Sequence, residues 1–277
     1  MKFIEKYFVS AIRKTMWLSL CSMFLCGSIQ KDDGSRKHLV IKTSCDYFQV
    51  DNLGNIYAVK EDELIKFLPS GKLFARYSNL TLGNISHMDV TNPLKILLYY
   101  RDYQQIIFLD DQLSVNSDKV ALEQLGYEQT DLVCAGNNNS FWIYNKQNNE
   151  LLRFNESSNK IAATGNLKQV LRTNIHPNFM LEHNGFLYLN CPDAGIYVFD
   201  IFGTFSKIIS IPNLKQFQVN EQIIYYQKDS TLCSYDSKRF EETCKLVPNH
   251  RFKPLTKFYR GTVYSAFNDS ITVLSGQ

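Results

Sequence analysis

The feature that most restricts how this chain can fold is a repeat of about forty residues. An apolar segment that carries a tyrosine recurs six times, with successive tyrosines 37 to 45 residues apart. A second apolar segment follows each tyrosine, and its marker residue lies 10 or 11 positions later. The marker pairs are Tyr57 with Phe67, Tyr99 with Leu109, Tyr144 with Phe154, Tyr188 with Phe199, Tyr225 with Tyr235, and Tyr264 with Leu274.

Further apolar segments flank these two in each unit. In the first unit, residues 47–50 precede the turn Asp51-Asn-Leu-Gly54, and residues 72–77 follow the second marker. Gly and Asn in such turns accept the positive φ that tight hairpins require. Four antiparallel strands in about 40–45 residues make one propeller blade, whose faces are covered by its neighbours. We therefore predict an all-β fold, a single six-bladed β-propeller over residues 39–277.

The two ends of the repeat array predict how the ring closes. The sixth unit ends after residues 271–274 without an outer strand, and a spare apolar segment at residues 39–42 precedes the first unit. Pairing these two segments would hide two open sheet edges, so we expect an N-terminal strand to close the ring. Residues 114–127 depart from the repeat, and we expect a short helix or a long loop there.

Residues 1–28 have the order of a secretory signal peptide. Four basic residues come before an apolar run at residues 16–26, and the small residues Gly27 and Ser28 follow. The run is shorter than the roughly 20 apolar residues of a membrane span, although an uncleaved anchor is the alternative. We expect an exported protein in the periplasm, at the outer membrane or on the cell surface, with residues 29–38 as a linker.

Cysteine usage gives two further expectations. Cys26 is a candidate for lipidation, although Leu25 stands where a lipobox has a small residue; a lipid would be the chain's one contact with a membrane. Cys233 and Cys244 fall opposite each other if the intervening residues form a hairpin turn, so they are the candidate disulfide, with two free buried thiols as the alternative.

The charge distribution argues against nucleic acid as a partner. The formal net charge of +3 comes from the leader, since 26 basic and 26 acidic residues remain after Ser28. Those charges are interspersed and make no basic patch that could hold a phosphate backbone.

One stretch resembles a known family. The run Asp51-Asn-Leu-Gly-Asn-Ile-Tyr-Ala-Val59, followed by Ile65-Lys-Phe67 and Ser70-Gly-Lys72, is similar to the repeat of NHL-type six-bladed propellers. It also resembles exported propeller proteins of the Bacteroidota. The resemblance implies a binding role, often within a cell-envelope assembly, and it implies no catalytic residues because the matched positions are structural.

No catalytic or cofactor motif is present, and we assign no catalytic, cofactor or metal residues. Lactonase-like propellers hold a metal in the central channel through acidic and Asn side chains. The four residues that would serve such a metal-dependent hydrolase are Asp89, Glu182, Asn190 and Asp193, and turn chemistry explains them better.

The sequence therefore predicts a non-catalytic exported binding or scaffold propeller with protein partners in the cell envelope and no cofactor. A glycan or small-ligand binder is the alternative, and the metal-dependent hydrolase is less favoured. The aromatic residues considered as glycan-stacking platforms are Trp142, Tyr99, Tyr100, Tyr225 and Tyr226.

Overall fold

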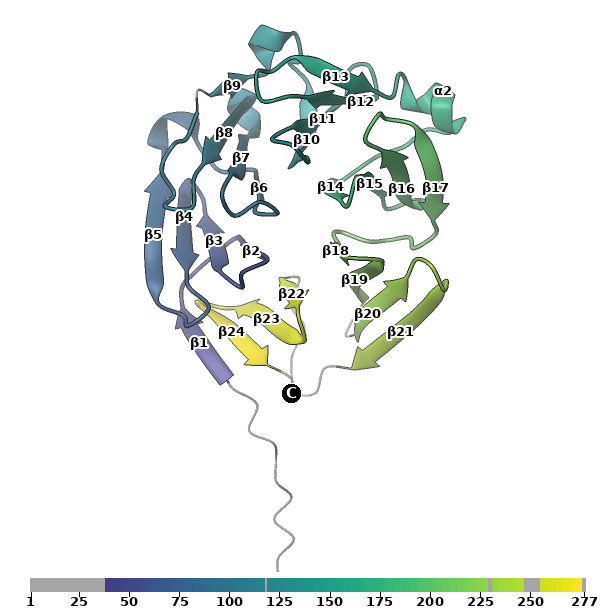
Figure 1. Ribbon diagram of the computed structural model, residues 1–277. Helices are drawn as coiled ribbons and strands as arrows, with labels where there is room; N and C mark the ends of the chain where they lie inside the picture. Colours follow the sequence, from purple (N-terminus) through teal and green to yellow (C-terminus); the bar gives the residue numbers. More distant parts are fainter. Residues whose placement is uncertain (1–37, 118, 229–230, 247–254, 276–277) are drawn as a thin grey trace, which may run out of the picture. The chain divides into compact units, whose positions relative to one another are not determined.

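Six four-stranded antiparallel sheets form the blades of the propeller (Figure 1). The computed structural model describes residues 38–117, 119–228, 231–246 and 255–275, so the predicted leader, linker and Cys26 lie outside the described residues. Within each blade the first strand is innermost and the last is outermost.

The first three blades follow the chain in order. Blade 1 contains β2 (Tyr47–Val50), β3 (Ile56–Lys60), β4 (Glu63–Phe67) and β5 (Leu73–Ser78); blade 2 contains β6 (His87–Asp89), β7 (Ile96–Tyr100), β8 (Gln105–Leu109) and β9 (Val120–Ala121); blade 3 contains β10 (Thr130–Ala135), β11 (Phe141–Asn145), β12 (Glu150–Phe154) and β13 (Lys160–Ala163).

The last three blades follow the same order. Blade 4 contains β14 (Phe179–His183), β15 (Phe186–Cys191), β16 (Gly195–Asp200) and β17 (Phe205–Ile209); blade 5 contains β18 (Gln218–Asn220), β19 (Ile223–Lys228), β20 (Thr231–Asp236) and β21 (Glu241–Leu246); blade 6 contains β22 (Thr256–Tyr259), β23 (Thr262–Phe267), β24 (Ser270–Ser275) and, from the start of the domain, β1 (His38–Lys42).

Short helical turns occupy some connections between strands. They are η1 (Leu80–Leu82), η2 (Arg101–Tyr103), η3 (Glu123–Leu125) and α2 (Leu167–Leu171). The expectation for residues 114–127 was incomplete, because this segment contains η3 and also β9, the outer strand of blade 2. The strand is only two residues long, too short for its pattern to stand out in the sequence.

The prediction of ring closure by an N-terminal strand is confirmed. Strand β1 pairs antiparallel with β24, with Ile41 opposite Ile271. It takes the outermost position that the end of the chain leaves open, so the two ends of the domain share one sheet. The pairing removes an exposed edge and fastens blade 6 to the beginning of the repeat array.

All six repeat tyrosines lie in the second strand of their blades, and all six second markers lie in the third strand. Tyr57 and Tyr99 pack on the side of the following blade, whereas Leu109 and Phe154 pack on the side of the preceding blade. The two sets of markers therefore form the two walls of the junctions between blades.

The constant spacing in sequence conceals two strand registers. Tyr57 pairs with Lys66, whereas Tyr99 pairs with Ile106 and sits two positions further along its strand. The second and third strands are joined through residues 61–62 in blade 1 and through residues 101–104 in blade 2, which accounts for the difference. A shift of two positions keeps the side chain on the same face of the strand.

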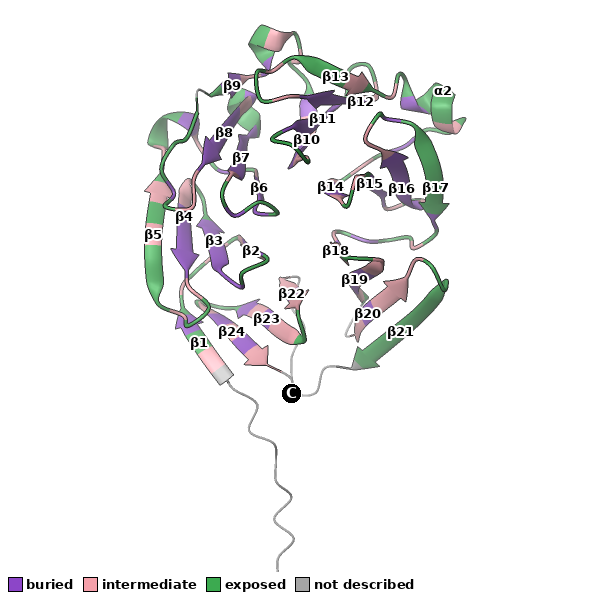
Figure 2. Ribbon diagram, viewed as in Figure 1, coloured by how far each residue is buried: buried purple, intermediate pink, exposed green. Residues whose placement is uncertain are grey.

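Burial follows this radial arrangement. The middle strands of blades 1 to 4 are largely buried, those of blades 5 and 6 are mostly of intermediate exposure, and the outer strands β5, β17 and β21 are largely exposed (Figure 2). Clusters of buried apolar side chains fill the junctions between blades 1 and 2, 2 and 3, 3 and 4, 4 and 5, and 6 and 1. Over the residues that the structure describes, the junction between blades 5 and 6 has no such cluster.

Strand β1 offers a matched test of closure. The side chain of Ile41 is 5% exposed in the cluster between blades 6 and 1, whereas that of Val40 is 47% exposed. Ile41→Ala should lower the free energy of unfolding by about 2–5 kcal/mol, because it leaves a cavity in the closing layer. Val40→Ala should change it by about 0.5 kcal/mol or less. Chemical denaturation measures both, and equal effects would contradict an integral role for β1.

Candidate functional site

The first strands of five blades line a cavity of about 320 Å³, which we call the channel. These strands are the innermost of their blades and lie around the axis of the propeller (Figure 1). The walls of the channel come from β2, β6, β14, β18 and β22 and from the turns that follow these strands. The side chains that contribute polar or aromatic groups include Gln49, His87, Phe179, His183, Gln218, Asn220, Tyr225, Phe258 and Arg260. The channel is therefore the part of the fold where side chains from most blades meet.

Burial lowers the pKa of two histidines in the channel wall. Desolvation by burial lowers the pKa of His87, whose ring packs edge-on against Phe179 with 6.4 Å between ring centroids. Burial also lowers the pKa of His183, and its Nε2 accepts a hydrogen bond of 3.1 Å from the backbone N–H of Glu221. That acceptor role requires an unprotonated Nε2.

The channel carboxylates have structural partners. Asp89 accepts hydrogen bonds from the backbone N–H groups of Thr91, at 2.9 Å, and Ala135, at 3.0 Å. Glu182 accepts one from the N–H of Asn137 at 2.8 Å. Asp89 and Glu182 thus hold the end of β10 from the two neighbouring blades.

The other two residues considered as metal ligands are also placed by the structure. Asn190 is buried and donates hydrogen bonds to Asn178 Oδ1 and to the carbonyl oxygen of Leu214, which ties blade 4 to the segment leading into blade 5. Asp193 is exposed and lies 3.3 Å from His176. The four candidates therefore do not converge on one point in the channel.

Glu182 also belongs to a buried group of polar side chains between blades 3 and 4. Its Oε2 accepts a hydrogen bond of 2.6 Å from the indole N–H of Trp142 and lies 3.8 Å from Nη2 of Arg153. The side chains of Glu182 and Arg153 are 1% and 7% exposed. Arg153 further donates to Ser140 Oγ and to backbone carbonyl oxygens of both blades. The position of Glu182 in the channel wall is thus explained by its hydrogen bond with Trp142 and its ion pair with Arg153.

The proposed aromatic platforms are mostly inaccessible. Trp142, Tyr99, Tyr100 and Tyr226 are buried, so they cannot stack on a ligand at the surface. Tyr99 and Tyr100 point to opposite faces of one strand and are both buried, because neighbouring blades cover both faces. Tyr225 is the member of the set that reaches the channel.

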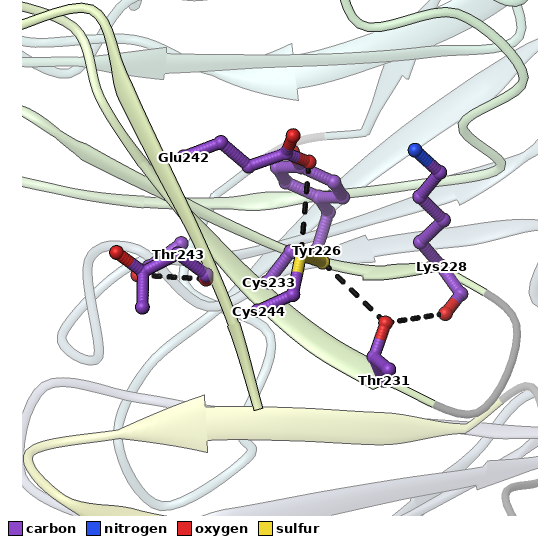
Figure 3. Close-up of a disulfide and its surroundings, with 8 residues drawn as sticks. Tyr226, Lys228, Thr231, Cys233, Glu242, Thr243 and Cys244 are labelled. Atoms are coloured by element: carbon purple, nitrogen blue, oxygen red, sulfur yellow. Dashed lines mark hydrogen bonds between the residues drawn. A yellow bond between two sulfur atoms is a disulfide. The ribbon is translucent and has the colours of Figure 1, made fainter. Parts of the chain in front are cut away.

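The structure places the two predicted cysteine partners opposite each other in β20 and β21 and joins them by a disulfide (Figure 3). Glu242 lies beside them and accepts a hydrogen bond from the hydroxyl of Tyr226. Within the described residues, Cys233, Cys244 and Glu242 are also the one cluster with the spacing of a metal site, and the disulfide leaves its sulfurs unable to bind a metal as thiolates.

The sequence analysis missed a collection of exposed apolar side chains. We use the term first-turn face for the end of the propeller that carries the turns from first to second strand and from third to fourth strand. On adjacent blades 4 and 5, Phe186, Phe202, Phe205 and Phe240 are exposed there, with Phe202 at 71% and Phe240 at 74%. The available signal was a Phe within the turns that follow Asp200 and Asp236, where turn residues are usually polar.

The turn that carries Phe202 is fixed in place. Asp200 accepts hydrogen bonds from the backbone N–H groups of Phe202 and Thr204, at 2.9 and 2.8 Å. Gly203 has a φ of +86°, and a Cβ there would lie 3.0 Å from the backbone of Ala163 in blade 3. The positive φ and the close approach favour glycine at this position, and the hydrogen bonds to Asp200 fix the backbone of the turn that carries Phe202.

Within the described residues, no helix has the length and apolarity needed to span a bilayer.

The fold and the channel define the class: a six-bladed β-propeller of four-stranded blades. No protein-family model matches the sequence, and no curated protein matches it. Solved structures with the same fold are distant in sequence. The chain aligns with a virginiamycin B lyase from Staphylococcus aureus solved with quinupristin, at 14% identity and a TM-score of 0.56 over 83% of this chain and 80% of that one.

Two other solved structures have different roles. The Neurospora crassa Pan2 WD40 domain aligns at 10% identity and a TM-score of 0.58, over 90% of this chain and 92% of that one. The extracellular domain of a one-component system from B. thetaiotaomicron aligns at 12% identity and a TM-score of 0.53, over 82% of this chain and 32% of that one. Similarity at this level establishes the fold and leaves function to the residues.

The pair of Glu182 and Arg153 provides a test of the junction between blades 3 and 4. Glu182→Gln keeps the size of the side chain but removes its charge, so the guanidinium is left buried without a counter-ion. We expect a loss of about 3 kcal/mol or more in the free energy of unfolding. The control is Glu63→Gln, which breaks the exposed pair with Arg76 and should cost about 1 kcal/mol or less. Equal losses in denaturant unfolding would contradict the assigned role.

The lowered pKa values of His87 and His183 predict how stability depends on pH. Their pKa values are lower in the folded chain than the value of about 6.5 in the unfolded chain, so the unfolded state binds more protons on acidification. Stability should be fully present above about pH 6.5 and should fall as pH drops below it. Thermal unfolding of His183→Gln should show a smaller fall between neutral and acidic pH than wild type. An unchanged pH profile would count against this assignment.

Proposed function

We propose that this chain is an exported, non-catalytic binding propeller that serves as a scaffold through protein–protein contacts in the cell envelope. The observation that carries the proposal is the set of exposed phenylalanines on the first-turn face of blades 4 and 5. Aromatic side chains are enriched in the centres of protein interfaces, where they supply a large contact area on few rotatable bonds. Rigid turns, such as the one at Gly203, lower the entropic cost of binding.

Export is supported by two observations. The order of charged, apolar and small residues in 1–28 is that of a secretory signal peptide. The disulfide between Cys233 and Cys244 fits an oxidising compartment such as the periplasm, the outer membrane environment or the cell surface. Lipidation at Cys26 belongs to the same proposal, as does kinship with NHL-like exported propellers of the Bacteroidota.

The absence of a catalytic role is also part of the proposal. The side chains weighed as metal ligands for a lactonase-like hydrolase interact with backbone groups or with other side chains, in separate parts of the fold. The lyase among the solved structures shares the fold alone with this chain, so its reaction is not transferred.

A glycan or small-ligand binder is the second candidate function, favoured by Tyr225. Its ring is half-buried in the channel wall and lies 4.6 Å, centroid to centroid, from Phe258 of the next blade. An aromatic face at the edge of a cavity suits stacking against a sugar ring.

The scaffold proposal is tested by site-specific photo-crosslinking in cells. A photoreactive residue at position 202 or 240 should give the same discrete crosslinked protein. The control positions are 80 and 267, which are exposed residues on the opposite end of the ring. Position 80 lies between the outer strand β5 and the first strand β6, and position 267 lies where the second strand β23 leads into the third strand β24. They should give no such product. Phe202→Asp with Phe240→Asp should weaken the isolated complex at least about tenfold, since interface aromatics carry a large share of binding energy.

Two results would contradict the proposal. Crosslinks of equal yield from both ends of the ring would show that the first-turn face is not a specific surface. An unchanged affinity in the doubly substituted chain, with unchanged thermal unfolding, would remove the phenylalanines from the interface.

A further inference from the structure

The junction between blades 5 and 6 differs from the other junctions in what fills it. Over the described residues it holds no buried apolar cluster and instead contains a cavity of about 400 Å³. Cavities of about 300–1,000 Å³ are the usual size of small-ligand sites. Five of the six junctions are therefore packed by apolar side chains, and the described part of the sixth leaves room for a molecule.

A buried lysine lines this cavity. Lys257, in β22, is 3% exposed, and its Nζ donates a hydrogen bond of 3.0 Å to the side-chain oxygen of Gln216. Burial lowers the pKa of the ammonium group to about 8, with desolvation as the cause. The structure thus holds a positive charge at the cavity wall against a desolvation cost.

The other buried cations have acidic neighbours. Arg153 forms an ion pair with Glu182. Desolvation lowers the pKa of Lys66, and the negative charges of Asp51 and Asp111 partly offset this by raising it. None of the described residues that line the cavity of Lys257 is acidic, and Lys215 adds a second positive charge to its wall. Among the described residues, Lys257 therefore has no counter-ion of the kind that a buried charge normally has.

A purely structural role would not require this charge. At the junction between blades 2 and 3, the neutral amide of Gln104 bonds to the backbone of Thr130 in both directions. At the junction between blades 4 and 5, the neutral amide of Asn190 bonds to the carbonyl oxygen of Leu214. Neutral side chains thus join the blades at these two junctions, and the buried cations that join blades elsewhere, Lys66 and Arg153, have acidic groups nearby. The charge of Lys257 has no such partner among the described residues, and a ligand that enters the cavity would supply one.

The rest of the wall indicates the kind of molecule. Tyr225 provides a partly exposed aromatic ring, and amide side chains, Gln216 among them, provide hydrogen-bonding groups. Phe217 and Tyr226 also line the wall, but both are packed in the apolar cluster between blades 4 and 5. Aromatic faces pack against the C–H faces of sugar rings, amides bond hydroxyl groups, and an ammonium group bonds a carboxylate. A ring that carries both hydroxyl groups and a carboxylate matches all three.

We propose that the cavity between blades 5 and 6 binds a uronic-acid-type sugar, with the Lys257 ammonium as the counter-ion of its carboxylate. The site lies between blades and is separate from the exposed phenylalanines of the first-turn face. Binding there neither requires nor excludes a protein partner on that face, so this proposal stands or fails independently of the scaffold role.

Calorimetric titration of the full chain with D-glucuronate and D-galacturonate tests the proposal. D-glucose is the matched ligand without the carboxylate, and benzoate is a carboxylate without hydroxyl groups. We expect at least one uronate to bind at millimolar concentration or below, with glucose and benzoate at least tenfold weaker. Lys257→Met should weaken uronate binding about ten- to hundredfold, as expected for a lost hydrogen bond to a charged group. Lys215→Met, which changes the exposed lysine of the wall, should weaken it less than about threefold.

Thermal unfolding of Lys257→Met separates the ligand role from a structural role. If Lys257 serves a ligand, the Lys257→Met chain should unfold at the same temperature as wild type or at a higher one, because an uncompensated buried charge has been removed. A lower unfolding temperature together with unchanged uronate affinity would overturn the proposal. So would equal binding of glucose and glucuronate, binding of benzoate without the uronates, or no binding of either uronate at millimolar concentration.

Discussion

The fold depends on one constraint: a four-stranded sheet of this composition cannot cover both of its own faces. The second strands of blades 1 to 4 are buried on both sides, as the pair Tyr99 and Tyr100 shows, and the covering surface comes from different neighbours on the two sides. A blade is therefore stable only between two others. The ring is the arrangement that gives every blade two neighbours, and β1 is required because the last blade would otherwise end in an open edge.

Polar side chains determine how the blades are aligned within that apolar arrangement. Lys66 and Arg153 occupy corresponding positions in β4 and β12, and each donates to a backbone carbonyl oxygen in the next blade, that of Asp111 or Ile201. The two carbonyls belong to the residues that directly follow the turn residues Asp110 and Asp200. A long basic side chain, lysine in one case and arginine in the other, thus reaches the equivalent turn of the next blade at two junctions. Neighbouring blades are therefore aligned by this hydrogen bond as well as by apolar packing.

The repeat is interrupted at the two places where we propose binding. Phe202 and Phe240 stand in turns, where residues are usually polar. At the junction between blades 5 and 6, the described residues form a cavity with a lysine in its wall in place of an apolar cluster. Positions that break a local rule without gaining stability are where function is expected. Both departures involve blade 5, so this part of the ring carries the chemical differences from an otherwise regular structure.

The sequence by itself determined the number of blades, the strands that hold each marker and the strand that closes the ring. These follow from the periodicity of apolar residues and turn residues, which is local along the chain. It also placed Cys233 opposite Cys244 through the length of one hairpin. Only the tertiary structure decided the register of Tyr57 against Tyr99, because turns of different length gave the same spacing.

The tertiary structure also decided which polar and aromatic residues are available. Glu182 and Trp142 are forty residues apart in the chain, and their hydrogen bond across two blades removes both from the set of binding groups. The residues next to Lys257 in the sequence do not distinguish it from a surface lysine. That it is buried with no acidic group among the described residues of its cavity is seen only when the walls are assembled from two blades. Burial and pairing are set by contacts between distant segments, and a single sequence records the segments but not the contacts.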